Sequence, residues 1–317
     1  MTSYAETLVF YFTRGDDPNM THPDHPASPQ NQPNEWLTDS NGELALSIRF
    51  KGDRLFQEQS PYQTVEVFDT HSCGKMLTID SMVMCTEWDE AAYHEMITHV
   101  PMLTHPGIKD VLVIGAGDGG TIRELMRHSS VEKVVMVEID EAVVRASKLF
   151  LPTISSAFDD PKLTLLIDDG IKFVSDAADA SYDLVIIDSS DPVGPSEGLF
   201  TKSFYEDVHR ILRPGGVITV QSESPSFNPK AFTELNPCLK SVFGEDQVHC
   251  YLVFIPTYPT GLWSLTYCSK DGPHPLKQFE AAKSSTFAKE HGLRYYNEDV
   301  HTAAFSLPTY IRNMINQ

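Results

Sequence analysis

Two carboxylates stand three residues apart, at Asp188 and Asp191, directly after a largely apolar stretch at residues 183–187. Such a stretch is typical of a buried strand in a parallel sheet, and ligands of such sheets bind at the carboxyl ends of the strands. Two acids at this position would hold an amine, and Asp188 would be close enough to accept its proton. The alternative is a solvated turn, because Asp, Pro and Gly are also common in surface loops.

A glycine-rich stretch, GAGDGG at residues 115–120, follows a second apolar run at residues 111–114. Glycine permits positive φ angles and lets a ligand approach the backbone closely. The stretch formally matches the GxGxxG pattern of dinucleotide-binding proteins, but Asp118 in its middle would repel a pyrophosphate. This loop therefore favours a cationic ligand. Asp118 could also cap the helix that follows, and the two roles are compatible.

Glu138 and Asp169 end the next two apolar stretches of the chain. An acid about 20 residues after the glycines hydrogen-bonds the ribose hydroxyls in nucleoside-binding folds, which predicts this role for Glu138. Asp169, followed by Gly170, is then placed to accept a hydrogen bond from the exocyclic amine of the base. The alternative for Asp169 is the N-cap of a helix over residues 171–176.

The elements that would position these residues are strands and helices in alternation from residue 111 to 268. Their order resembles the seven-stranded, methyltransferase-type Rossmann sheet, so the predicted class is α/β with helices on both faces. We expect a turn at residues 213–216, and another at 256–261 with Tyr258 exposed. A helix over residues 89–104 is predicted to begin the catalytic domain, which would extend from residue 89 to 317.

Short alternating apolar runs precede this domain and predict a small antiparallel β-sheet domain at residues 36–88, a candidate lid or oligomer surface. Residues 1–35 are rich in Pro, Asn, Asp and Gln after a short apolar run at 7–13. They are predicted to be an extension that is partly disordered or that serves as an arm onto a neighbouring subunit.

The composition limits the partners that this chain can bind. A net charge of −20 opposes binding to nucleic acid or to an anionic membrane and suits a cationic small molecule. The sequence has neither an apolar run near the roughly 18 residues of a membrane helix nor a basic, apolar N-terminus, which predicts a cytoplasmic protein. Five widely spaced cysteines without a CxxC pair indicate reduced thiols. His94 and His99 are five residues apart, which does not match shared metal ligation on a helix, so no metal is expected.

In chain order, these motifs resemble those of the polyamine aminopropyltransferase family, over roughly residues 36–310. The matching segments are SPYQTVEVF, CTEWDEAAYHEM, VLVIGAGDGGTIRE, VEIDEAVV, DDG, DSSDPVGP, IPTYPTG and RYYNEDVHTAAFSLP. The resemblance implies transfer of an aminopropyl group from decarboxylated S-adenosylmethionine to putrescine, which yields spermidine and 5′-methylthioadenosine. It also implies no cofactor, because decarboxylated S-adenosylmethionine is a co-substrate. Relatives are commonly homodimers or homotetramers, so self-association is expected.

The resemblance also assigns roles to individual residues of this chain. Contacts to the nucleoside donor are implied for Gln63, His94, Asp118, Glu138, Asp169 and Gly170, and a contact to methylthioadenosine is implied for Pro195. Asp188 would be the proton acceptor, and the diamine site would be lined by Tyr93, Asp191, Gln221 and Tyr258, with Trp263 as a weaker candidate. Tyr93 and Asp191 are expected to act with Asp188 in catalysis.

Three positions depart from the family pattern. Ala116 stands where the family often has glycine, and its methyl group is expected to be tolerated near the ligand. Ser81 and Met84 replace a common glycine and a common glutamine. Because Met84 cannot make the contacts of a glutamine, the donor contacts at this position are open.

The chemistry of Asp118 favours the decarboxylated donor. Intact S-adenosylmethionine would bring its carboxylate against Asp118, whereas decarboxylation leaves only an amine. An ordinary S-adenosylmethionine methyltransferase is therefore disfavoured. The same aminopropyl transfer onto agmatine, cadaverine or spermidine stays open, as does a noncatalytic binding protein of this fold.

Overall fold

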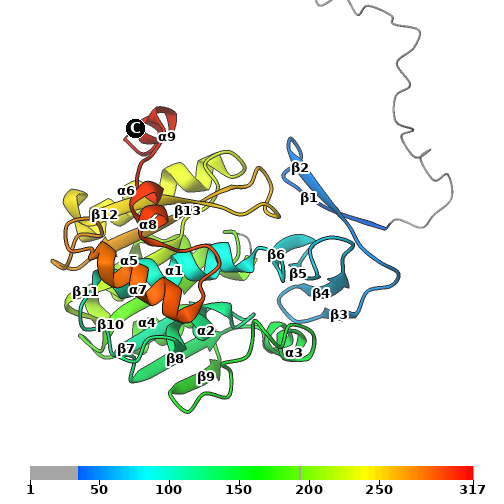
Figure 1. Cartoon of the computed structure of the whole chain (residues 1–317), viewed down its shortest axis with the longest axis horizontal. Coiled ribbons are helices and arrows are strands. Elements are labelled where there is room, and N and C mark those ends of the chain that lie inside the picture. The colour runs from blue at the N-terminus through cyan, green and yellow to red at the C-terminus, as the bar shows by residue number, and fades with distance from the viewer. Residues whose placement is uncertain (1–34, 193, 317) are drawn as a thin grey trace, which may run out of the picture. The chain divides into compact units, whose positions relative to one another are not determined.

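The computed structural model describes residues 35–192 and 194–316 (Figure 1). The predicted apolar arm at residues 7–13 and the proline-rich segment after it lie outside the described residues.

A seven-stranded sheet forms the centre of the fold, in the order β12-β13-β11-β10-β7-β8-β9. Its five strands from β7 to β11 run parallel, and β12 and β13 form an antiparallel hairpin on the β11 side. The predicted α/β class and Rossmann-like sheet are therefore confirmed. The strands are β7 (Asp110–Gly115), β8 (Lys133–Glu138), β9 (Leu163–Ile167), β10 (Tyr182–Asp188), β11 (Leu212–Gln221), β12 (Val248–Phe254) and β13 (Leu262–Ser269).

The strand order reverses between β7 and β10, since the chain adds β8 and β9 on one side of β7 and later adds β10 and β11 on the other. Asp188 at the end of β10 pairs with Gly115 at the end of β7. Open α/β sheets bind their ligands at such a reversal, outside the carboxyl ends of the strands. The topology therefore brings the two predicted motifs to one point.

Helices cover both faces of the sheet (Figure 1). In β7, Val111 and Val113 pack on the face covered by α1 and α2, whereas Leu112 and Ile114 pack on the face covered by α5 and α6. The helices are α1 (Glu90–Thr104), α2 (Gly120–Met126), α3 (Glu141–Phe150), α4 (Gly170–Asp176), α5 (Lys202–Ile211), α6 (Pro229–Phe243), α7 (Ala281–His291), α8 (Glu298–Ala304) and α9 (Thr309–Ile315), with short 3-10 helices η1 (Gly194–Phe200) and η2 (Glu245–Gln247).

Helix α1 is buried along its whole length, from Glu90 to Thr104, and not only on the apolar face that its sequence indicates. A carboxylate in such a helix must find partners, because an unpaired buried charge is strongly destabilising. Glu95 accepts hydrogen bonds from the backbone N–H groups of Arg294, Tyr295 and Tyr296, each at 2.8 Å. The segment before α8 is thereby fixed against α1.

The N-terminal β region contains two sheets, whereas the sequence predicted one. A hairpin of β1 and β2 packs its apolar side against one face of a four-stranded antiparallel sheet, and the other face of that sheet packs on α3. The short strands of this region were only partly predicted, because β1 and β3 have few apolar residues. Their bounds are β1 (Trp36–Ser40), β2 (Ala45–Arg49), β3 (Phe56–Gln59), β4 (Thr64–Asp69), β5 (Lys75–Ile79) and β6 (Met82–Thr86).

The predicted turn at residues 213–216 is wrong. These residues lie within β11 as a bulge, since the pairing with β10 jumps from Tyr182 opposite Leu212 to Leu184 opposite Val217. Gly215 adopts a φ of 81° there, which explains why the segment has the composition of a turn.

Candidate active site

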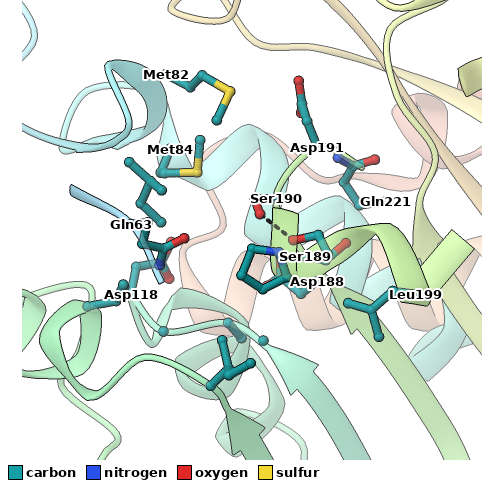
Figure 2. Close-up of a pocket in the computed structure, with 18 of the residues that line it drawn as sticks. Gln63, Met82, Met84, Asp118, Asp188, Ser189, Ser190, Asp191, Leu199 and Gln221 are labelled. Atoms are coloured by element: carbon teal, nitrogen blue, oxygen red, sulfur yellow. Dashed lines mark hydrogen bonds between the residues drawn. The ribbon is translucent and has the colours of Figure 1, made fainter. Parts of the chain in front are cut away.

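A cavity opens at the carboxyl ends of β7, β8, β10 and β11 and is closed on one side by the turn and strand of the small sheet around β6. In Figure 2, Gln63, Met84 and Asp118 lie on one wall, and Asp188, Asp191 and Gln221 lie on the opposite wall. The sequence-predicted residues that line the cavity are Gln63, Tyr93, Asp118, Glu138, Asp169, Gly170, Asp188, Asp191, Pro195, Gln221, Tyr258 and Trp263.

The glycines of the loop after β7 are required by the residues packed around them. A Cβ on Gly115, whose φ is 84°, would overlap the backbone oxygen of Asp188, and a Cβ on Gly117 would lie 2.9 Å from Oε2 of Glu138. Ala116 is buried and adopts a φ of 65°, a left-handed conformation that is uncommon for a residue other than glycine. The loop thus keeps a conformation that glycine favours, with the extra methyl group accommodated.

Asp118 uses both carboxylate oxygens within the protein. Its Oδ1 accepts a hydrogen bond from the backbone N–H of Gly120 at 2.7 Å, and its Oδ2 lies 3.2 Å from Nε2 of His94. Burial would raise the pKa of Asp118, but the charge of His94 and these hydrogen bonds bring the pKa below its usual value. Asp118 therefore stabilises the start of α2 and also presents an ionised carboxylate to the cavity.

His94 does not line the cavity, in contrast to its predicted contact with the donor. Its side chain is only 1% exposed and lies beneath Asp118. Its neighbour Tyr93 reaches the cavity instead, since consecutive residues of a helix point about 100° apart.

The residues predicted to bind the nucleoside lie where the cavity meets the carboxyl ends of β8 and β9. Glu138 is buried, and burial raises its pKa to about 7, while its Oε1 accepts a hydrogen bond from the N–H of Asp140 at 2.9 Å. Asp169 is the N-cap of α4, because its Oδ1 accepts hydrogen bonds from the N–H groups of Ile171 and Lys172. Both bonds use one oxygen, so the capping role and a ligand contact through the other oxygen are compatible.

Asp188 is held at both carboxylate oxygens by hydroxyl groups. Oδ1 accepts a hydrogen bond from Tyr93 at 2.7 Å, and Oδ2 accepts one from Thr121 at 2.6 Å. Burial raises the pKa of Asp188, and the charge of Asp118 raises it further. Thr121 was not among the predicted residues, although its place directly after the glycines could have indicated it.

Asp191 belongs to a second pair of acidic side chains, which it forms with Glu223. Its Oδ2 accepts a hydrogen bond from Nδ2 of Asn228 at 2.8 Å, and the same nitrogen donates to Oε2 of Glu223 at 2.6 Å. Gln221 donates to Oε1 of Glu223 at 2.9 Å. Burial raises the pKa of Asp191 to about 6 and that of Glu223 to about 8. This pair of carboxylates would release protons to pair with an ammonium group.

Glu223, Asn228 and the cavity-lining Asp39 of β1 were missed by the sequence analysis. Glu223 comes two residues after Gln221 at the end of β11, so its position relative to the strand could have indicated it. Its φ of 72° is a strained conformation for a glutamate, and such strain is concentrated at functional sites.

Tyr258 is partly buried, which corrects the prediction that it is exposed at its turn. The turn folds back over the cavity, and the Tyr258 hydroxyl donates a hydrogen bond to the backbone oxygen of Met84 at 2.5 Å. The Tyr258 ring lies against Trp263 with 5.0 Å between ring centroids and near Tyr93 at 6.3 Å. These three aromatic side chains form an apolar wall of the cavity.

The departures at Ser81 and Met84 have different consequences. Ser81 lies in the turn between β5 and β6 with a φ of 68°, a conformation that glycine adopts without strain. Met84 places its side chain in the cavity (Figure 2). It therefore supplies an apolar contact where a glutamine would supply hydrogen bonds.

Within residues 35–192 and 194–316, no cluster of three or more His, Cys, Asp or Glu side chains is arranged to hold a metal ion. In the same part of the chain, no helix is long and apolar enough to cross a membrane.

Comparison with known proteins decides the family. A model described as the spermine/spermidine synthase domain matches residues 90–281, and one described as the spermidine synthase tetramerisation domain matches residues 36–87. The chain belongs to the spermine/spermidine synthase family. As a member of this family, it is an aminopropyltransferase of polyamine biosynthesis.

Individual members of the family match almost the whole chain. The polyamine aminopropyltransferase of Clostridioides difficile (strain 630) is 44% identical over 287 residues, which cover 89% of this chain and 99% of that protein. The polyamine aminopropyltransferase of Methanocaldococcus jannaschii is 41% identical over 284 residues, which cover 89% and 95% of the two chains.

Solved structures of the family agree with this fold. A spermidine synthase in complex with the transition state analogue AdoDATO superposes with a TM-score of 0.85 at 36% identity and covers 90% of this chain and 97% of its own. The spermidine synthase of Thermotoga maritima gives a TM-score of 0.84 at 36% identity, with 90% and 96% covered.

Proposed function

We propose that this aminopropyltransferase transfers the aminopropyl group of decarboxylated S-adenosylmethionine to putrescine, with Asp188 as the proton acceptor. The observation that carries the proposal is the Asp188 carboxylate, held by Tyr93 and Thr121 in a cavity whose other acids are Asp118 and Asp191. These acids provide sites for the amine of the donor, the reacting amine of the acceptor and its second amine.

The donor is a nucleoside with a sulfonium and an amine, and the cavity offers a complement to each part. Glu138 is the proposed partner of the ribose hydroxyls, and Asp169 with Gly170 is the proposed partner of the base. Gln63 and Pro195 complete the nucleoside end. The ionised Asp118 would attract the amine of the aminopropyl arm. We propose no further cofactor, since the sulfonium of the donor activates the group that is transferred.

The reaction requires an unprotonated amine near the electrophilic carbon. The acceptor nitrogen attacks the methylene group next to the sulfonium, the new N–C bond forms as the C–S bond breaks, and the bonding electrons return to sulfur. An aliphatic amine with a pKa near 10 is mostly protonated at neutral pH. Asp188, whose pKa is raised by burial and by the charge of Asp118, is a stronger base than an ordinary aspartate and takes the proton. Tyr93 and Thr121 fix its orientation, which holds the reactants about 3 Å apart and in line.

The second ammonium of putrescine is the proposed ligand of Asp191, which lines the cavity, and Glu223 is the buried carboxylate behind it that adds negative charge. Asn228 holds the two carboxylates together, and Gln221 orients Glu223. The apolar wall of Tyr93, Tyr258 and Trp263 would cover the methylene groups between the two ammonium groups. A diamine therefore matches this part of the cavity better than a monoamine does.

Replacing Asp191 with Asn is expected to raise the KM for putrescine about tenfold, because a charge-assisted bond to the second ammonium is lost. Steady-state kinetics at saturating donor measure this. Butylamine, which lacks the second ammonium, provides the matched control, and its KM should be the same for both enzymes. An equal rise for butylamine and putrescine would show that Asp191 does not hold the second ammonium.

The KM for putrescine is also expected to fall as the pH rises from 6 to 8.5. The pKa of Asp191 is about 6 and that of Glu223 about 8, so both carboxylates lose their protons over this range and attract the ammonium more strongly. The initial rate as a function of putrescine concentration at each pH gives this KM. A KM that stays constant or rises over the range contradicts the assignment of these acids to the diamine.

We further propose a division into a small β-sheet domain at residues 36–88 and a catalytic domain at 89–317, and assembly into a homodimer or homotetramer. The match of residues 36–87 to the tetramerisation domain supports self-association through the small domain. Large apolar side chains exposed in this region also support self-association. These side chains are Trp36, Leu44, Leu55, Tyr62 and Trp88.

Release of methylthioadenosine from decarboxylated S-adenosylmethionine in the presence of putrescine tests the proposed function. Methyl transfer from intact S-adenosylmethionine without methylthioadenosine release would contradict it.

A further inference from the structure

His94 lies between two carboxylates in the interior of the protein. Its Nε2 is 3.2 Å from Oδ2 of Asp118, and its Nδ1 is 2.7 Å from Oε2 of Glu90, one helical turn earlier in α1. A neutral imidazole has one nitrogen without a hydrogen, and that lone pair would face a carboxylate oxygen. With both carboxylates ionised, as the lowered pKa values of Glu90 and Asp118 indicate, both contacts are favourable only when both ring nitrogens carry hydrogens, so the geometry points to an imidazolium.

Glu90 is itself paired with two cations, Arg123 and the more exposed Arg294, whose Nη1 lies 3.4 Å from Oε1. Its Oε2 accepts a hydrogen bond from Nη2 of Arg123 at 2.7 Å, and its Oε1 accepts one from Nη1 at 3.2 Å. Arg123 also donates from Nε to Oε1 of Glu124 at 2.7 Å. Charges of alternating sign therefore run from Asp118 through His94, Glu90 and Arg123 to Glu124. Each buried charge has partners of the opposite sign, as a buried network requires.

The chain of contacts has little freedom to rearrange. Gly120 packs against the His94 ring so closely that a Cβ at this position would overlap it. His94 is 1% exposed and Glu90 is 5% exposed, so water cannot replace either partner. His94 and Glu90, which do not line the cavity, consequently help to set the orientation of the Asp118 carboxylate.

We propose that Glu90 is a positioning residue that acts through His94 to hold the Asp118 carboxylate where it meets the amine of the donor, with Arg123 supporting Glu90. The inference rests on the proposed function, in which Asp118 binds this amine. Burial, the largest effect on His94, lowers its pKa, but the charges of Asp118 and Glu90 and the hydrogen bonds to them bring the pKa well above its usual value. The direction of this shift agrees with the geometry.

The Glu90→Gln variant tests the proposal, with Glu124→Gln as the matched control. Glu124 is as buried as Glu90 and contacts the same Arg123, but it does not touch His94. Both substitutions remove one buried negative charge beside Arg123. Only Glu90→Gln removes the carboxylate that faces Nδ1 of His94. A general loss of stability, measured by thermal unfolding, should therefore affect both variants.

The readout is the dissociation constant of two ligands, decarboxylated S-adenosylmethionine and 5′-methylthioadenosine. Methylthioadenosine has the same nucleoside but lacks the amine, so effects on Glu138 and on the base site cancel in the ratio of the two constants. Glu90→Gln is expected to raise the dissociation constant of decarboxylated S-adenosylmethionine about tenfold and to change that of methylthioadenosine by less than about twofold. Glu124→Gln is expected to leave the ratio unchanged. The KM for the donor should rise in Glu90→Gln, while the KM for putrescine stays the same.

A nitrogen-15 NMR spectrum of the wild-type protein keeps the proposal testable if Glu90→Gln does not fold. With the His94 signals assigned from His94→Gln, both ring nitrogens should be protonated at pH 8. A neutral imidazole would overturn the proposal. An unchanged ratio of the two dissociation constants in Glu90→Gln would also overturn it, whether the binding of both ligands weakens equally or not at all. These outcomes differ from a failure of the proposed function, in which the wild-type protein itself releases no methylthioadenosine.

Discussion

The Asp188→Asn variant is expected to turn over about a hundred to ten thousand times more slowly than the wild-type enzyme, while the Kd for decarboxylated S-adenosylmethionine changes little. Asparagine has nearly the same shape and can keep a hydrogen bond with Tyr93 or Thr121, so the cavity should persist. It cannot accept the proton of the attacking amine. Single-turnover kinetics measure the rate of the chemical step, and calorimetry measures donor binding.

Asp191→Asn is the matched control for this experiment. It removes one charge three residues away in the same cavity, but at saturating putrescine its single-turnover rate should approach that of the wild-type enzyme. A wild-type rate in Asp188→Asn would show that another group accepts the proton. A rate loss of equal size in both variants would mean that the chemical step depends on the total negative charge of the cavity and not on a base at Asp188.

The second large effect is expected in Asp118→Asn, which should lose the preference for decarboxylated over intact S-adenosylmethionine. In the wild-type protein, the ionised Asp118 attracts the amine of the donor and repels the carboxylate that intact S-adenosylmethionine carries beside its amine. The substitution removes both effects and leaves the His94 imidazolium facing an uncharged amide. The Kd for intact S-adenosylmethionine divided by the Kd for the decarboxylated donor should therefore fall by about tenfold or more.

Calorimetric titrations of both ligands into both proteins give this ratio directly. Methylthioadenosine, which carries neither the amine nor the carboxylate, should bind the two proteins equally and reports on the integrity of the nucleoside site. An unchanged ratio with normal methylthioadenosine binding would refute the assignment of Asp118 to donor selection.

The parts of the fold that the sequence predicted are those determined by local patterns. The apolar runs of β7 and β10 identify strands buried on both faces, and the glycines between β7 and α2 identify the loop. Because the carboxyl ends of parallel strands meet at one edge, the sequence alone is enough to place Asp118, Glu138 and Asp188 in one cavity.

The rest could not be predicted, because it depends on contacts between distant segments. Tyr258 is partly buried because its turn packs against distant segments, among them Met84, which is 174 residues earlier in the chain. The place of Glu223 just after β11 could have indicated it, but its link to Asp191 could not be predicted, because it runs through the side chain of Asn228. His94 lies beneath Asp118 and not in the cavity because the packing of α1 against α2 sets its direction.

The most direct test of the account is the product that the enzyme makes. The protein is incubated with decarboxylated S-adenosylmethionine and, separately, with putrescine, cadaverine, agmatine and spermidine, and chromatography quantifies methylthioadenosine and each polyamine. The account predicts equal amounts of methylthioadenosine and spermidine, with putrescine as the preferred acceptor. Preference for another amine would contradict the acceptor assignment and leave the chemistry intact, whereas the absence of methylthioadenosine with every amine would contradict the aminopropyl transfer itself.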